Sequence, residues 1–402
     1  MLNQNQERCV KINEKSIFVV SGAGTGKTRV IYERIKYLIS KKVDFDTILY
    51  ISFTKQSTHD VKKRFIIETD KPVIKTFHGL AYSHNDSISR KSLVNLESDI
   101  FYEYDTNRLS QINAKKGVLT FKNKTTKPLS RYNALLAKND LFDYVDLEIA
   151  FIHKMKDFGC VESSFLPYSY IFVDEAQDMS EIQFTTLRLL VKPGVNLFLV
   201  GDPDQSIYSF RGAQPSMVTR LINTFNCHVL SLNENYRSCG AIIDTANRVI
   251  QHNRNPKRHP LIAHRNTPGM VEYHMFSNSK NEAQFIFQKI TTFLHQKYHQ
   301  NDMVILVRNH FQATEIKRVL QLSYYNDVDC LSIHASKGLE YRIVFIVGIE
   351  NPNVKDHHQL EEERRLFFVA ITRAKDILIM TSSDDKVIPK FIKESEVKVT
   401  KH

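Results

Sequence analysis

Residues 200–213, VGDPDQSIYSFRGA, bring groups that could contact a phosphate close to groups that could stack on a nucleic-acid base. Three polar side chains follow an apolar run, and two aromatic rings and a guanidinium group come shortly after. Such a segment could connect nucleotide hydrolysis to the movement of a strand, although a strand end followed by a loop with core aromatics would have the same pattern. The residues are Asp202, Asp204 and Gln205, then Tyr208, Phe210 and Arg211.

Residues 21–28, SGAGTGKT, lie between an apolar run and a helical pattern, which is where a phosphate-binding loop belongs. Three glycines let successive backbone N–H groups face phosphate, and the helix N-terminus adds to the attraction. Lys27 would reach the β- and γ-phosphates of ATP, and Thr28 would hold Mg²⁺. Ser21 stands where the pattern usually has Gly or Ala. The residues expected to surround the phosphates are Ser21, Gly22, Ala23, Gly24, Thr25, Gly26, Lys27 and Thr28.

Residues 171–178, IFVDEAQD, place two carboxylates at the end of a short apolar run. Asp174 would bind Mg²⁺ through water, and Glu175 would orient and deprotonate the attacking water. Adjacent acids at a strand end can also be solvated caps, but the glycine-rich loop favours the catalytic interpretation. This pair therefore predicts the hydrolytic half of an ATP site.

Two arginines in the second half of the chain, Arg237 in NYRS and Arg373 in TRA, could bring positive charge to the γ-phosphate. An arginine in that position raises the rate of phosphoryl transfer by roughly 10³–10⁵. If both reach across a cleft between two lobes, the lobes share ATP and its hydrolysis changes the gap between them. Either arginine taken alone would more commonly be a surface residue.

The composition favours a polyanionic partner, because the 402 residues carry a formal charge of +11. Residues 108–131 and 246–271 are basic and contain no acid, although each could simply be a solvated loop. Five scattered cysteines form no Cys-x-x-Cys pair, so a zinc ribbon or iron–sulfur cluster finds no ligand set. No signal peptide or membrane-spanning run is visible, so we expect a soluble, cytoplasmic protein with no membrane contact.

Short apolar runs alternate with helical patterns, which is typical of parallel α/β folds. We expect two α/β lobes that meet near Leu230, with a basic, partly helical insertion in the first. The predicted first lobe comprises residues 1–84 and 166–228, the insertion 85–165, and the second lobe 229–402. The predicted strands are 16–20, 48–53, 170–173, 196–200, 227–230, 303–307, 328–333, 343–348 and 377–381. The predicted helices are 28–40, 55–66, 142–155, 182–191, 241–251, 282–297 and 361–370.

In order and wording these motifs resemble the UvrD/Rep/PcrA family of superfamily 1 DNA helicases. LNQNQ at the start is similar to the family's Q motif, and residues 53–55 and 76–80 are similar to its first-lobe DNA motifs. Residues 200–213 resemble its motif III, 235–238 motif IV, 332–341 motif V and 361–375 motif VI. The resemblance implies two RecA-like P-loop NTPase lobes, with parallel sheets flanked by helices and a small, mainly helical insertion in the first.

The resemblance also implies roles for individual residues. Gln6 would read adenine, Tyr236 would stack on it, and Glu340 would bind the ribose, with Gly338 also among the nucleotide-binding residues. Gln205 would sense the γ-phosphate, with Arg237 and Arg373 completing the site. The residues implied to contact DNA are Phe53, Thr54, Thr76, His78, Tyr208, Phe210, Arg211 and His334.

Two departures from the family pattern stand out. The chain contains no Trp, and Phe210 lies where the family usually has one. Too few residues separate Arg237 from Ser332 for the large second-lobe insertion of long members, so this is a short form. The basic residues 108–131, with Phe121 and Tyr132, are the candidate for additional strand or duplex contacts.

The sequence thus predicts an ATP- and Mg²⁺-dependent helicase and translocase on single-stranded DNA and its junctions with duplex. Movement in the 3′→5′ direction is implied by the resemblance alone. An alternative is a DNA-stimulated motor subunit of a larger repair, replication or defence complex. Two further alternatives are a nucleotide-dependent binding module and a small-molecule P-loop kinase. The binding module would not need the complete hydrolytic set, and the lobe-spanning arginines and residues 208–211 argue against the kinase.

Overall fold

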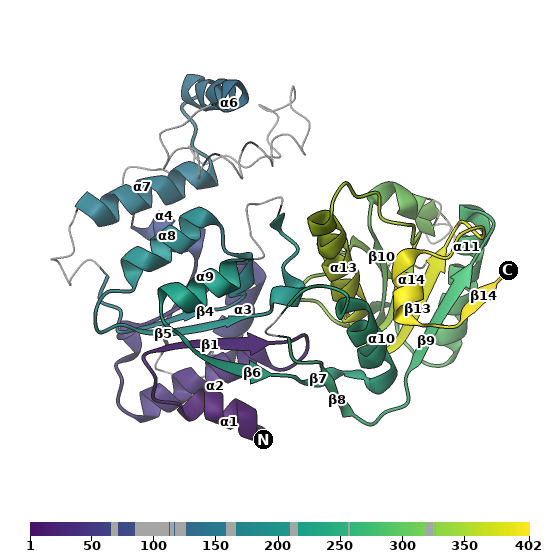
Figure 1. Ribbon diagram of the computed structural model, residues 1–402, viewed down its shortest axis with the longest axis horizontal. Coiled ribbons are helices and arrows are strands. Elements are labelled where there is room, and N and C mark those ends of the chain that lie inside the picture. Colours follow the sequence, from purple (N-terminus) through teal and green to yellow (C-terminus); the bar gives the residue numbers. More distant parts are fainter. Residues whose placement is uncertain are drawn as a thin grey trace. The chain divides into compact units, whose positions relative to one another are not determined.

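The computed structural model places most of the chain in two compact units, each with its own parallel sheet (Figure 1). Unit 1 comprises Met1–Val20 and Lys27–Ser231, and unit 2 comprises Ser21–Gly26 and Leu232–His402. The structure describes residues 1–65, 71–84, 112, 116, 126–157, 166–209, 216–255, 258–314, 316–318, 325 and 327–402.

The sheet of unit 1 has six strands in the order β3-β2-β4-β5-β1-β6. Near-continuous apolar sequence buries the inner strands on both faces, as a parallel sheet requires. Val20 pairs with Gly201, and Val173 pairs with Leu199, so β1, β4 and β5 end at the same edge. Residues that follow these strands therefore collect at one carboxyl edge, where α/β sheets place their ligands. The strands are β1 Ser16–Ser21, β2 Ile48–Ser52, β3 Val73–Thr76, β4 Tyr170–Val173, β5 Asn196–Gly201 and β6 His228–Leu232.

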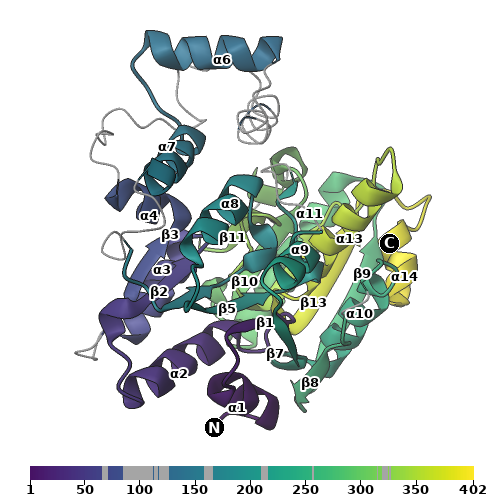
Figure 2. The same cartoon turned by 60° about the vertical axis from the view of Figure 1, so that its left-hand side comes forward.

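Helices cover both faces of this sheet, with α8 and α9 on one side and α1 and α2 on the other (Figure 2). Three short 3₁₀ turns, η1 Phe45–Thr47, η4 Ala176–Asp178 and η5 Pro203–Gln205, join the elements, and the last two directly follow β4 and β5. The helices are α1 Gln4–Lys11, α2 Lys27–Ser40, α3 Lys55–Arg64, α4 Phe77–Ser83, α6 Lys127–Lys138, α7 Tyr144–Asp157, α8 Glu181–Leu190 and α9 Met217–Thr224.

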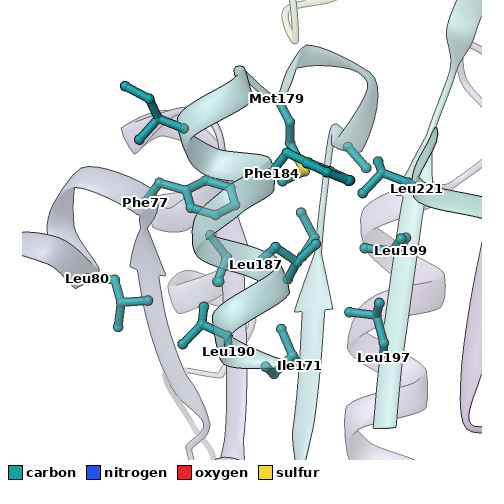
Figure 3. Packing of buried hydrophobic residues seen from close by; sticks show 14 of the residues in the cluster. Phe77, Leu80, Ile171, Met179, Phe184, Leu187, Leu190, Leu197, Leu199 and Leu221 are labelled. Carbon is teal, nitrogen blue, oxygen red and sulfur yellow. The ribbon is translucent and has the colours of Figure 1, made fainter. Parts of the chain in front are cut away.

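The main core of unit 1 lies between α8 and the sheet (Figure 3). Leu187 of α8 is fully buried against Leu197 and Leu199 of β5, which are also inaccessible. Phe198, the strand residue between them, faces the other side, where the Arg34 guanidinium lies 4.8 Å from its ring centroid. Alternation along the strand thus serves both faces, and each fully buried Leu contributes roughly 1.5–3 kcal/mol.

Unit 2 contains a six-stranded sheet in the order β11-β10-β12-β13-β9-β14 and a small parallel pair, β7 and β8. Helix α11 buries Ile286 and Ile290 against Ile305 and Phe345 of the large sheet. Helices α10 and α13 contact β13 and each other. The strands are β7 Glu234–Cys239, β8 Ile262–Arg265, β9 Met270–Met275, β10 Met303–Val307, β11 Asp329–Ser332, β12 Tyr341–Val347, β13 Ala374–Ser382 and β14 Val399–Lys401. The helical elements are α10 Gly240–Ile250, α11 Ser279–His295, η7 Gln300–Asp302, η8 His310–Ala313, α13 His357–Ile371 and α14 Lys390–Ser395.

The predicted α/β fold is confirmed, and all nine predicted strands are present with ends that shift by a few residues. Shorter or more polar elements were missed, including α1, α4, β3, β7 and β8. Part of the basic stretch 246–271 is ordered secondary structure rather than a solvated loop, because it contains the end of α10 and all of β8. Within the described residues, no helix combines the length and apolarity needed to cross a bilayer.

In the predicted insertion, the helical pattern 142–155 is confirmed as α7. Tyr132 of α6 is wrongly predicted as a surface contact, since its side chain is completely buried. Its hydroxyl donates to Asp143 at 2.8 Å, and the same carboxylate accepts from the buried Lys116 ammonium at 2.9 Å. Desolvated polar groups need such partners, so these two side chains stabilise the insertion. Phe121 lies outside the described residues.

Candidate functional site

In unit 1, Lys27 is the first residue of α2, and its side chain is only 11% exposed. Its Nζ atom is buried and makes no hydrogen bond within the described part of the chain. Glu175 Oε1 lies 3.8 Å away, an ion-pair distance that leaves the three ammonium donors without acceptors. A buried ammonium without acceptors is unfavourable, so this position fits an anion such as a phosphate.

Asp174 follows β4 directly, and its carboxylate is 3% exposed. It accepts hydrogen bonds from the Tyr50 hydroxyl at 3.0 Å and from the Glu175 backbone N–H at 2.9 Å. The Thr28 hydroxyl donates to its Oδ2 at 3.4 Å. Burial, followed by the adjacent charge of Glu175, raises the pKa of Asp174 to about 6. A nearby cation would reverse this shift, because it favours the ionised carboxylate.

Glu175 has a left-handed backbone, with φ 54° and ψ 41°. This conformation costs a residue with a Cβ on the order of 1–3 kcal/mol, and such strain often accompanies functional sites. Its carboxylate accepts from the Gln177 side-chain amide at 2.5 Å. The backbone therefore turns Glu175 away from the strand direction, beside the Lys27 ammonium.

The end of β5 supplies a third buried carboxylate. Asp202 is 4% exposed, and its oxygens accept from the Asp204 backbone N–H at 3.0 Å and from the Gln205 amide at 2.5 Å. Burial raises the pKa of Asp202 to about 6, although the Lys27 charge works in the opposite direction. Gln205, the predicted phosphate sensor, is thus held by a neighbour from its own segment.

In unit 2, Ser21–Gly26 is packed by backbone and polar contacts. Gly24 and Gly26 have φ values of 66° and 86°, which favour glycine. The carbonyl of Ala23 accepts from the Asn235 amide at 2.7 Å, and the carbonyl of Gly24 accepts from the Tyr236 N–H at 2.9 Å. A Cβ on Gly24 would lie 2.5 Å from the Asn235 side chain, so no larger residue fits there.

Arg237 is bound within unit 2 by an ion pair. Its Nε donates to Glu340 at 2.7 Å, and its Nη1 donates to the Thr372 carbonyl at 3.1 Å. The other carboxylate oxygen of Glu340 lies 2.8 Å from the Lys375 ammonium. Although burial opposes it, the charges of Arg237 and Lys375 lower the pKa of Glu340 to about 2. The structure therefore brings together two residues that the motifs assign to different parts of ATP.

Arg373 comes two residues after α13 and is 2% exposed. Its guanidinium donates to the carbonyl oxygens of Val369 at 2.9 Å and Leu339 at 3.1 Å. It also donates to the Thr372 hydroxyl at 3.2 Å. These contacts connect α13 to the segment that contains Gly338 and Glu340. Gly338 itself has φ 90° and open space around it.

Tyr236, the predicted adenine platform, lies on β7 and is supported by β8. Its hydroxyl donates to Glu234 at 2.9 Å. The His264 ring lies 4.5 Å from its ring centroid at an interplanar angle of 43°. Gln6, the predicted adenine reader, is buried in the capping box of α1, where it accepts from the Asn3 N–H at 3.1 Å.

The predicted DNA contacts have local structural partners. Tyr208 is 8% exposed, and its ring stacks on Phe53 with centroids 5.3 Å apart. Thr54 and Thr76 are the N-caps of α3 and α4. Tyr208 is therefore paired with another aromatic ring where the motif implied an open face.

His78 lies 3.3 Å from the buried Glu148 carboxylate, and its ring lies 4.6 Å from that of Tyr144. His334 follows β11 and its carbonyl accepts from the Lys337 N–H at 3.3 Å. Phe210 and Arg211 lie outside the described residues. Of the predicted strand contacts at residues 208–211, the structure therefore describes only Tyr208.

Several residues at these sites were missed by sequence reasoning. Tyr50 binds Asp174, Gln177 binds Glu175, and Asn235 binds the glycine-rich loop. Gln177 and Asn235 lie inside the recognised motifs, next to the proposed catalytic groups. That position in the sequence could have indicated that they contact those groups. Tyr50 lies in an apolar strand and offered no such signal.

Comparisons with known proteins match almost the whole chain. The UvrD/REP helicase N-terminal domain matches residues 2–124 and 83–226. The UvrD-like helicase C-terminal domain matches residues 230–324 and 320–385. The two matches meet close to the boundary between the two units.

Similar proteins are helicases by name. A probable DNA helicase of Mycoplasma pneumoniae is 31% identical, over 95% of this chain and 83% of its own length. ATP-dependent DNA helicase Rep of Buchnera aphidicola is 28% identical, over 79% of this chain and 54% of its own length. ATP-dependent DNA helicase PcrA of Staphylococcus aureus is 27% identical, over 80% of this chain and 50% of its own length. The chain thus spans about half the length of the Rep and PcrA relatives, and with both domain matches it belongs to the UvrD/Rep family of superfamily 1 helicases.

Proposed function

We propose that the chain is an ATP-dependent DNA helicase that moves 3′→5′ along single-stranded DNA and separates the duplex ahead of it. The observation that carries the ATP chemistry is Lys27, whose buried ammonium has no hydrogen-bond acceptor in the described residues and follows a glycine-rich loop. The buried carboxylates of Asp174 and Asp202 lie close enough to interact with its charge. Lys27 therefore lies near several carboxylates, an arrangement that fits phosphates accompanied by a metal ion.

Thr28 and Asp174 are the proposed protein ligands of Mg²⁺. Thr28 Oγ1 and Asp174 Oδ2 lie 3.4 Å apart, near the N-terminus of α2. The described residues contain no group of three or more His, Cys, Asp or Glu side chains that could hold a metal alone. That suits Mg²⁺, which commonly takes one or two protein oxygens and completes its shell with phosphates and water. When bound, the ion would neutralise charge that develops on the phosphates.

Glu175 is the proposed general base, and Gln205 the proposed γ-phosphate sensor. A base at this position contributes roughly 10²–10⁴-fold by orienting and deprotonating water. The residues proposed to hold nucleotide are Gln6, Ser21, Gly22, Ala23, Gly24, Thr25, Gly26, Lys27, Thr28, Tyr236, Arg237, Gly338, Glu340 and Arg373. Because Arg237 is paired with Glu340, it must exchange this partner for phosphate when it acts.

DNA is the proposed polyanionic partner, supported by the charge of +11 and by the helicase relatives. The proposed strand contacts are Phe53, Thr54, Thr76, His78, Tyr208, Phe210, Arg211 and His334. We also propose that the basic residues 108–131 of the predicted insertion make additional DNA contacts, and that the protein is cytoplasmic. Binding should weaken steeply with salt, because backbone contacts release counterions.

The test measures ATP turnover by the purified chain alone and with single-stranded DNA, duplex DNA or RNA. Single-stranded DNA should raise kcat, and Lys27→Ala or Glu175→Gln should abolish most of the increase. Duplexes with 3′ or 5′ tails then report direction, and a 3′ tail should be required for strand separation.

Three outcomes decide between the proposals. Turnover that no polynucleotide changes would contradict a nucleic-acid motor. Turnover that RNA raises more than DNA would contradict the proposed substrate. DNA-stimulated turnover without strand separation would favour a motor subunit of a larger repair, replication or defence complex, which adding candidate partner proteins would test.

A further inference from the structure

Gln177 lies in η4, the short turn after β4, and both ends of its side-chain amide are engaged. Its Nε2 donates to Glu175 Oε2 at 2.5 Å, with a longer contact of 3.4 Å to Asp178. Its Oε1 accepts from the Asp202 backbone N–H at 2.9 Å. The residue is 1% exposed, so water does not compete for either end. One side chain therefore bridges the turn after β4 and the segment after β5.

The neighbouring backbone is built closely around this amide. A Cβ added to Gly201 would lie 2.8 Å from Gln177 Oε1 and 3.2 Å from its backbone nitrogen. The Ser206 hydroxyl also donates to the Gln177 carbonyl, at 3.4 Å. Because Gly201 has no Cβ, the Gln177 amide fits against it. The turn after β4 and the end of β5 therefore pack closely at this point.

The bridge continues to Gln205 through Asp202. The Asp202 carboxylate accepts from the Gln205 amide at 2.5 Å, and the Asp202 carbonyl accepts from the Gln205 N–H at 3.0 Å. Hydrogen bonds therefore run from Glu175 through Gln177 and Asp202 to Gln205. All four residues belong to unit 1.

We propose that Gln177 is a positioning residue for ATP hydrolysis. Its amide fixes the position of the Glu175 carboxylate relative to Asp202 and Gln205. This role presupposes the ATP chemistry proposed above, in which Glu175 activates water and Gln205 contacts the γ-phosphate. A displacement of Gln205 when phosphate leaves is then transmitted to the base by direct hydrogen bonds. Asn is one methylene too short to reach both partners, and Glu lacks the N–H donors that Glu175 needs.

Gln177→Glu is the sharpest variant. It keeps the length of the side chain and an acceptor for the Asp202 N–H, but it places a second carboxylate against Glu175. We expect kcat to fall by about 10- to 100-fold, because a displacement of about 1 Å can cost on the order of 10². The KM for ATP should change little, since the phosphate-binding groups remain.

Gln183→Glu is the matched control. Gln183 of α8 is 6% exposed, and its amide donates to the buried Glu148 carboxylate at 2.9 Å. The substitution therefore makes the same change in a similar environment, in α8 rather than in η4. Its DNA-free kcat should match that of the unmodified chain, even if its melting temperature falls as much as that of Gln177→Glu.

A double-mutant cycle with Gln205→Ala tests the connection itself. Residues that act as one unit give non-additive losses, so Gln177→Asn combined with Gln205→Ala should lose little more than the larger single loss. If Gln177→Glu does not fold, Gln177→Asn and this cycle decide. An unchanged kcat, an equal rise in KM, or additive losses would overturn the positioning role. Absence of ATP turnover in the unmodified chain would instead contradict the proposed function.

Discussion

In unit 1, Asp174 and Asp202, which follow β4 and β5, are buried carboxylates with a raised pKa. In unit 2, the carboxylate of Glu340 has a lowered pKa, because it is paired with Arg237 and Lys375. Burial raises the pKa of both Asp174 and Asp202 to about 6. Arg237 and Lys375 instead hold the pKa of Glu340 at about 2. Unit 1 therefore contains charges that gain from an added cation and phosphate. Unit 2 contains charges that are satisfied before any nucleotide arrives.

Under the proposed function, this difference affects how Lys27 and Arg237 would reach the phosphates. The Lys27 ammonium could donate to phosphate oxygens without losing a hydrogen bond in the described residues. If Arg237 acts on the γ-phosphate as proposed, it has to leave Glu340 and the Thr372 carbonyl first. Under that proposal, Lys27 would bind phosphate directly and Arg237 only after a local exchange of partners.

The largest effect should come from Arg237→Ala. If Arg237 exchanges Glu340 for the γ-phosphate, its loss should lower kcat by roughly 10³–10⁵. Arg308→Ala is the control, because Arg308 also makes a double hydrogen bond to a glutamate, Glu363, at 3.0 and 2.7 Å. It is 43% exposed, and exposed pairs contribute about 1 kcal/mol or less. Steady-state ATPase assays with single-stranded DNA give both numbers, and equal effects would show that the loss is not specific to Arg237.

The opposite electrostatics of the two units should also appear in stability. A carboxyl with a raised pKa in the folded protein destabilises it when ionised. The destabilisation of the folded chain by the Asp202 carboxylate is absent below the unfolded pKa of 3.8. It grows as pH rises and is complete above about pH 6. Relative to the unmodified chain, Asp202→Asn should therefore gain about 2 kcal/mol in free energy of unfolding between pH 4 and pH 7.

Glu340→Gln should show the reverse sign. The folded pKa of Glu340, about 2, lies below its unfolded value, so its stabilising contribution is present at neutral pH and lost as pH falls through 2. The variant should be less stable than the unmodified chain at pH 7, with the deficit shrinking toward pH 3. Urea unfolding followed by circular dichroism at each pH measures both differences. A pH-independent difference for Asp202→Asn would show that its carboxyl is not protonated more readily in the folded chain.

Sequence patterns predicted the features that depend on residues close together in the chain. Apolar runs located β4 and β5, and the residues at their ends identified Asp174, Glu175 and Gln205 as a group. The register of a parallel sheet then brings strand ends together, so the edge that carries these residues could be anticipated. The glycines of Ser21–Gly26 were equally readable from their spacing, and positive φ values favour glycine at Gly24 and Gly26.

The partners of these residues could not be predicted, because they come from distant parts of the chain. Tyr50 and Asp174 are separated by 124 residues, and Asn235 and Ala23 by 212. Whether Tyr208 faces solvent depends on the presence of Phe53 against its ring. The strand β8 is only four residues long, with two apolar and two polar residues, so its pairing with β7 has no periodic signal. Tertiary contacts rather than local pattern decide such cases.

The smallest effect concerns the support of Tyr236 by β8. His264 lies against the Tyr236 ring, while the Tyr236 hydroxyl is fixed by Glu234. Contacts between such rings contribute about 0.5–1.5 kcal/mol, which corresponds to about a 2- to 12-fold change in binding. If Tyr236 stacks on adenine, His264→Ala should raise the KM for ATP within this range and leave kcat nearly unchanged.

The controls for this prediction separate ring support from general destabilisation. His264→Phe keeps an aromatic ring at the position and should restore the KM. His252→Ala removes an exposed histidine from the end of α10 in the same unit and should change neither constant. A loss in kcat with an unchanged KM would mean that β8 acts on Arg237 rather than on Tyr236. Arg265 of β8 makes that outcome physically distinct, because its guanidinium donates to the Arg237 carbonyl at 2.6 Å.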